Sequence, residues 1–74
     1  MKYSAWFIAD GVHVLGINRR GHEVLLKRTR RGIPSGALGF DSRTEADMAI
    51  EFQKSYNFWP LFIHGAKVQL LSWS

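Results

Sequence analysis

The dipeptide Asp10-Gly11 separates two runs of strand-forming residues, "YSAWFIA" (3–9) and "VHVLGI" (12–17). Asp-Gly between two such runs is a strong signal for a two-residue hairpin turn, because both central positions need a positive φ. With that turn, Phe7 pairs with Val14. The first part of the chain is therefore predicted to form antiparallel rather than parallel sheet.

A second turn, "NRRG" (18–21), leads into a third predicted strand over residues 22–29. If Ile17 pairs with His22, alternation along the strands sorts the side chains onto two faces. The face predicted as the core collects Trp6, Ile8, Leu15, Ile17, Val24 and Leu26, and the opposite face collects Tyr3, Ala5, Phe7, Val14 and Leu25.

The break "GIPSG" (32–36) ends this sheet-forming part, and residues 37–40 are expected as a short fourth strand or as a loop. Ser42 followed by Glu45 matches a helix capping box and predicts a helix from about 43 to 56. Its apolar positions recur at helical spacing: Ala46, Ala49, Ile50, Phe52 and Tyr56. A last strand is expected over residues 66–73.

This order of segments predicts a small α+β fold. The expected architecture is an antiparallel sheet of four to five strands, in the order β-β-β-(β)-α-β, with one helix (about 43–56) packed on one face. A chain of 74 residues has room for one domain, 1–74, and such a small core is often supported by disulfides, a metal or a partner chain. Because the sequence has no cysteine, any such support must come from oligomerisation or a binding partner.

The net charge of +4 is unevenly distributed, with a basic segment over residues 19–31 and an acidic one over 41–51. Such asymmetry favours a basic surface for an anionic partner, although the two segments could also neutralise each other within the fold. On the predicted register the basic residues form two groups at opposite ends of the second hairpin, roughly 20–25 Å apart. The candidate partner-binding residues here are Arg19, Arg20, Lys27, Arg28, Arg30 and Arg31.

Large apolar residues crowd the stretch "FWPLFI" (58–63) after the helix. A small domain needs its large side chains in the core, and this is the first interpretation of the stretch. The second is a hydrophobic anchor for a partner, for which Trp59 and Phe62 are the candidates.

Catalytic, metal and cofactor sites are not expected. His13, His22 and His64 match no familiar metal-ligand spacing, and "GIPSG" lacks the lysine of a phosphate-binding loop. We therefore expect no enzyme activity, no metal and no cofactor. No secretory leader and no apolar run of about 20 residues is visible, which favours a cytoplasmic protein without a membrane span.

The chain is short, has no cysteine and is expected to form an α+β domain with a strand-turn-helix junction at "GFDSRTEADMAIEF" (39–52). In this organisation it resembles small phage-encoded inhibitor proteins, including anti-CRISPR proteins and inhibitors of host RNA polymerase. The resemblance covers the architecture and no motif, so it assigns no functional residue. It implies a non-catalytic protein, in the host cytoplasm if phage-encoded, that occludes a surface on a larger assembly.

Three functional hypotheses follow. In the first, a small basic interaction protein binds an acidic protein surface or a nucleoprotein complex through its basic hairpin and blocks it sterically. In the second, the same residues bind nucleic acid directly, with Tyr3, Trp6, Phe7 and Trp73 available for base stacking. In the third, the chain forms a homodimer through its last strand or the 58–63 stretch.

Overall fold

A computed structural model describes residues 3–30, 32–56 and 65–73, without the side chains of Lys54 and Tyr56. It confirms the small α+β fold: a four-stranded antiparallel sheet and one helix. The elements are β1 (Tyr3–Ala9), β2 (His13–Ile17), β3 (Glu23–Lys27), α1 (Arg43–Tyr56) and β4 (Lys67–Trp73).

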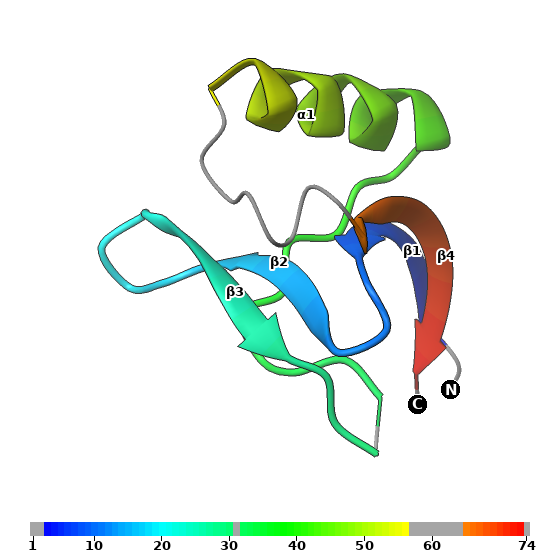
Figure 1. Cartoon of the computed structure of the whole chain (residues 1–74). Helices are drawn as coiled ribbons and strands as arrows, with labels where there is room; N and C mark the ends of the chain where they lie inside the picture. Colours follow the sequence, from blue (N-terminus) through cyan, green and yellow to red (C-terminus); the bar gives the residue numbers. More distant parts are fainter. Residues whose placement is uncertain (1–2, 31, 57–64, 74) are drawn as a thin grey trace.

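The strands lie in the order β3-β2-β1-β4, so the last strand of the chain pairs with the first. In Figure 1 the helix α1 lies across one face of this sheet, and β4 forms one outer edge. β1 and β4 pair along their whole length, from Tyr3 opposite Trp73 to Ala9 opposite Lys67. The two ends of the described chain therefore lie side by side.

The first turn is larger than the predicted two-residue turn. The Oδ1 atom of Asp10 accepts hydrogen bonds from the amides of Val12 (2.7 Å) and His13 (2.5 Å), and the amide of Asp10 donates to the carbonyl of His13. The resulting register places Ala9 opposite Val14, where the sequence predicted Phe7. The aspartate side chain, and not the glycine alone, determines this turn.

The second turn also differs from its prediction, by one residue. The Oδ1 atom of Asn18 accepts hydrogen bonds from the amides of Arg20 and His22, so the loop spans residues 18–22 and Ile17 pairs with Glu23. A one-residue shift moves every side chain of a strand to the other face. Leu25 therefore joins the face of Leu15, and the predicted placement of Val24 and Leu26 on that face is wrong.

The segment 36–40 lies between β1 and β2, which diverge after one residue pair. The amide of Leu38 donates to the carbonyl of Leu15, and Trp6 and Phe40 exchange both of their backbone hydrogen bonds. These are isolated bridges, so the segment is a loop that fills the gap in the sheet and not a fourth strand. The close approach is possible because residue 16, opposite it, is a glycine.

The helix begins and ends where the sequence predicted. The Oγ of Ser42 caps it by accepting a hydrogen bond from the amide of Glu45. Its buried positions are Ala46, Ile50 and Gln53, whereas Phe52, predicted on the apolar face, is 59% exposed. Gln53 donates a hydrogen bond through Nε2 to the carboxylate of Glu23 and so connects the helix to β3.

Both faces of the sheet are covered, not only the predicted one. Under the helix, Ile8 and Leu15 pack against Ile50. On the opposite face, Phe7, Ala9 and Val14 pack against side chains of the 32–37 loop and of β4, namely Ile33, Ala37, Leu71 and Trp73. The loop between β3 and the helix therefore serves as the second covering layer.

Candidate interaction surface

Arg19 and Arg20 lie at the tip of the loop 18–22, which we call the first arginine turn. Both are exposed. The amide of Asn18 donates to the carbonyl of His22 and the amide of Gly21 donates to the carbonyl of Asn18, in addition to the hydrogen bonds that the Asn18 side chain accepts. The turn therefore holds its backbone in place through asparagine and presents the arginines to solvent.

A second tight turn follows β3 and spans residues 29–32; we call it the second arginine turn. Thr29 and Gly32 exchange backbone hydrogen bonds across it, and the hydroxyl of Thr29 also donates to the carbonyl of Gly32. Gly32 has a φ of 126°, a conformation that favours glycine. Arg30 is exposed at this turn, whereas Arg31 lies outside the described residues.

Arg28 has a structural role that the sequence did not indicate. Its guanidinium donates a hydrogen bond to the carbonyl of Asp10 (3.2 Å), and its amide donates to the carbonyl of Val12. The residue is half-buried and ties the end of β3 to the first turn of the chain. Among the candidate arginines and lysine that the structure describes, Arg28 is therefore the one whose guanidinium is bonded within the fold.

Within the described part of the chain, the remaining candidates are not neutralised. No carboxylate lies within 4.0 Å of the cationic groups of Arg19, Arg20, Lys27 or Arg30; the ion pairs are Asp10 with His13 and Arg43 with Asp47. The acidic residues at 41, 45, 47 and 51 lie just before helix α1 and along it, whereas the arginine turns lie at the two ends of β3. The basic and acidic segments thus lie on different elements of the fold.

The Asp10 carboxylate lies among positive groups. Burial by itself raises its pKa, but hydrogen bonds from the amides of His13 and Val12, together with the charges of His13 and Arg28, bring the pKa below its ordinary value of 3.8. The charged form of Asp10 is therefore favoured in the folded state, where it organises the turn and anchors the region of Arg28.

A pH experiment tests this role. Because the folded-state pKa is lowered, the contribution of Asp10 to stability is present above its unfolded pKa and is lost as the pH falls through the folded value. We expect an Asp10→Asn variant to be less stable than the wild type by about 1 kcal/mol at pH 7, the size of a charge-assisted hydrogen bond. Urea titrations should show this difference shrinking below about pH 4; a difference that is constant with pH would contradict the assignment.

The aromatic candidates for base stacking are not equally accessible. Phe7 is buried in the core, at 2% exposure. Trp73 is half-buried against Phe7, while Tyr3 is 51% exposed and stacks on Trp73 with ring centroids 6.0 Å apart. Trp6 lies beneath the guanidinium of Arg43, 6.0 Å from its ring.

The second arginine turn lies beside this aromatic pair. A Cβ atom built on Gly32 would lie 3.1 Å from the Cβ of Trp73, so the turn packs against the end of β4. The two residues are far apart in the sequence, and no local pattern indicates that they meet. Trp59 and Phe62, the anchor candidates of the 58–63 stretch, lie outside the described residues.

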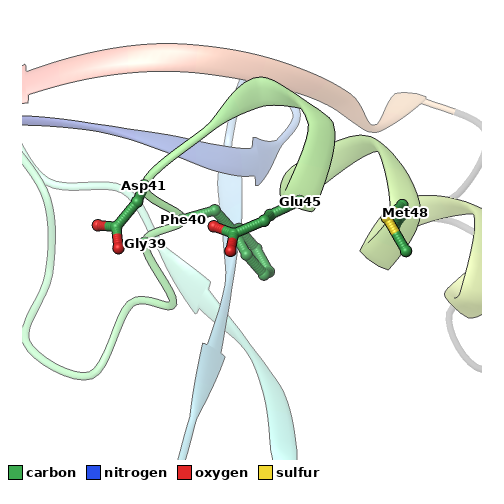
Figure 2. A pocket seen from close by; sticks show the side chains of 5 residues that line it. All are labelled: Gly39, Phe40, Asp41, Glu45 and Met48. Carbon is green, nitrogen blue, oxygen red and sulfur yellow. The ribbon is translucent and has the colours of Figure 1, made fainter.

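A hollow of about 350 Å³ lies between the first arginine turn and the helix, lined by Gly21, His22, Glu23 and Phe52. Two others lie along the helix. One, with a volume of about 340 Å³, is lined by Gly39, Phe40, Asp41, Glu45 and Met48 (Figure 2). The carboxylates of Asp41 and Glu45 lie at its rim, which is unfavourable for an anion. A second, of about 440 Å³, shares Met48 and continues along the helix past Phe52.

The described residues also bear on metal binding and on membrane insertion. Across residues 3–30, 32–56 and 65–73, no three histidine, aspartate or glutamate side chains come close enough to hold a metal ion. The helix seen in this same part of the chain is too short and too polar to cross a membrane.

Comparison of the chain with protein-family models, with curated proteins and with solved structures finds no match. The functional argument therefore depends on the geometry and charge of the surface itself.

Proposed function

We propose that this protein is a non-catalytic interaction protein. It binds an anionic surface of a larger macromolecular assembly, an acidic protein or a nucleoprotein, through its two arginine turns, and it acts by steric blocking. This mode of action is the one implied by the resemblance to small phage-encoded inhibitors.

The observation that carries the proposal is the pair of exposed arginine turns whose cationic groups pair with no described carboxylate. The side chain of Asn18 accepts, and the hydroxyl of Thr29 donates, the hydrogen bonds that hold the two backbones. The guanidinium groups of Arg19, Arg20 and Arg30 are therefore left to contact another molecule. A guanidinium presents paired donors that match a carboxylate or a phosphate.

The separation of the turns limits the kind of partner. Five residues of β3 lie between them, and at about 3.3 Å per residue the turns are on the order of 20 Å apart. A small anion could contact one turn only. A partner that uses both must present negative charge over an extended surface, which is characteristic of a macromolecule.

Charge reversal tests this proposal. The partner is first isolated by affinity capture from a bacterial lysate. We expect an Arg19→Glu, Arg20→Glu double variant to bind this partner about tenfold or more weakly, because like charges opposed across an interface cost several kcal/mol. The matched control is Arg43→Glu with Lys54→Glu, which changes the net charge equally and lies on the helix rather than on either arginine turn. Equal losses in the two variants, measured by surface plasmon resonance, would contradict a role for the turn.

Direct nucleic-acid binding is a second candidate, favoured by the position of the second arginine turn beside Trp73 and the exposed Tyr3. Cationic groups next to an exposed aromatic ring are suited to binding single-stranded nucleic acid, in which stacking of a base on the ring contributes about 1–3 kcal/mol per base. Fluorescence anisotropy with a labelled single-stranded oligonucleotide distinguishes the two candidates. Nucleic-acid binding requires affinity that falls steeply with salt and falls further in Tyr3→Ala.

A further inference from the structure

The outer edge of the sheet at β4 has a set of backbone hydrogen-bonding groups without a partner among the described residues. Trp6 exchanges its backbone hydrogen bonds with Phe40, at 3.0 and 2.7 Å, so its amide and carbonyl point away from β4. Leu70 lies directly opposite Trp6. In an antiparallel ladder, two residues that lie directly opposite each other direct their backbone groups either both toward each other or both away from each other. The amide and carbonyl of Leu70 therefore face the free edge.

The same alternation assigns the rest of the strand. Residues two apart have the same orientation, so Val68, Leu70 and Ser72 all direct their backbone groups outward. None of them makes a hydrogen bond through these groups to a residue in the described ranges. Figure 1 shows β4 as the outermost strand on its side of the sheet. An edge of seven residues with open donors and acceptors is a template for pairing with another strand.

The other edge, at β3, is better protected. The inward hydrogen bonds of Asn18 with His22 and of Arg28 with Val12 leave Glu23, Leu25 and Lys27 facing outward. Two of these three residues are charged, which is a common defence of an edge strand against pairing. The third, Leu25, already packs in the core. On β4 none of the three outward residues is charged, and Leu70 is 55% exposed.

We propose that β4 pairs antiparallel with β4 of a second copy of this chain, about a two-fold axis at Leu70. Leu70 then lies opposite the partner's Leu70, and Val68 lies opposite the partner's Ser72. Each of these outward pairs exchanges two hydrogen bonds, which gives about six in the interface. The two exposed leucine side chains meet on the helix face and become buried against each other.

The opposite face of the paired strands is also compatible with this register. Lys67 comes opposite the partner's Trp73, where an ammonium group beside an indole ring is favourable. The result is one continuous sheet of two chains. Both helices lie on the same face, and β3 with its two arginine turns lies at each far end. A second copy also supplies the support that a short chain without cysteine lacks. The closed symmetry limits the assembly to two chains.

A single introduced cysteine tests the register directly, since the chain has none of its own. In a Leu70→Cys variant, the two cysteines face each other at the Cα spacing of about 5.5 Å that suits a disulfide. We expect mild oxidation to convert most of the protein to a covalent dimer. Met48→Cys, at a position that is 69% exposed on the helix, is the matched control and should stay mostly monomeric. Equal cross-linking of the two variants would overturn the proposal.

The mass in solution provides the second measurement. By analytical ultracentrifugation at micromolar concentration, we expect about twice the chain mass of 8.5 kDa for the wild type and for Met48→Lys. Leu70→Pro removes the donor at the two-fold axis but no hydrogen bond within the monomer, and Leu70→Lys places like charges opposite each other. Both should be monomeric, with circular dichroism checking that they fold. A monomeric wild type, or dimers that persist in folded Leu70 variants, would overturn the proposal.

Discussion

A Gly16→Ala variant is expected to lose about 3 kcal/mol of stability, the upper part of the range for forcing an extra group into a packed core. A Cβ atom at residue 16 would lie 2.4 Å from the Cδ1 atom of Leu26 and 2.6 Å from the carbonyl oxygen of Gly36. The leucine side chain can rotate away, but the carbonyl belongs to the backbone that fills the gap between β1 and β2. That segment accepts a hydrogen bond from the amide of Ile17, so its displacement opens the sheet.

The matched control for this variant is Gly11→Ala. A Cβ atom at Gly11 meets no atom within 4 Å, and the φ of Gly11 does not lie in the left-handed range. We expect a change within about 0.5 kcal/mol, as for an ordinary surface substitution. Urea denaturation followed by tryptophan fluorescence measures both variants. If Gly16→Ala were as stable as Gly11→Ala, residues 36–40 would not lie between the two strands.

A Leu15→Ala variant is expected to lose about 2–5 kcal/mol, because the side chain is 1% exposed and lies at the centre of the core beneath the helix. Domains gain about 0.05–0.15 kcal/mol per residue on folding, so a chain of 74 residues has on the order of 4–11 kcal/mol in total. The substitution therefore removes a large part of the stability. Chemical denaturation at 25 °C measures the loss.

The control for this second prediction is Met48→Ala, on the outer side of the helix. Met48 is 69% exposed, so its truncation should change the free energy of unfolding by less than about 0.5 kcal/mol. Comparable losses at Leu15 and Met48 would mean that the helix does not pack on the face of the sheet that carries Ile8 and Leu15.

The strands and helix were predictable because their signals are local. The Ser42 cap and the spacing of apolar residues predicted the helix bounds, and the composition of the last segment predicted β4 to within one residue. The exposed Phe52 and the buried Gln53 were not predicted, because hydrophobicity alone does not account for a glutamine that bonds to β3.

The registers were not predictable from the same signals. Each turn is enlarged by a side chain that accepts two backbone hydrogen bonds, Asp10 in the first and Asn18 in the second. Generic turn statistics predict the shorter loops, and an error of one residue at β3 exchanges its two faces.

The candidate surface was predicted in part. The sequence indicated that the basic residues divide into two groups at the ends of the second hairpin, and the arginine turns lie there. It did not indicate that Arg28 bonds to Asp10 or that Gly32 meets Trp73. The first contact follows from the β2–β3 pairing, which brings the end of β3 to the first turn, and the second depends on how the long loop after β3 crosses the sheet. Long-range packing of this kind leaves no periodic pattern in the sequence.

The most direct test of the proposed function is affinity capture with tagged protein from a bacterial lysate, with and without nuclease. The wild type is compared with the Arg19→Glu, Arg20→Glu variant and with the Arg43→Glu, Lys54→Glu control. We expect a defined protein complex that survives nuclease treatment and is retained by the control but lost by the arginine-turn variant. Capture that is equal for all three proteins would contradict the account, as would recovery of nucleic acid alone.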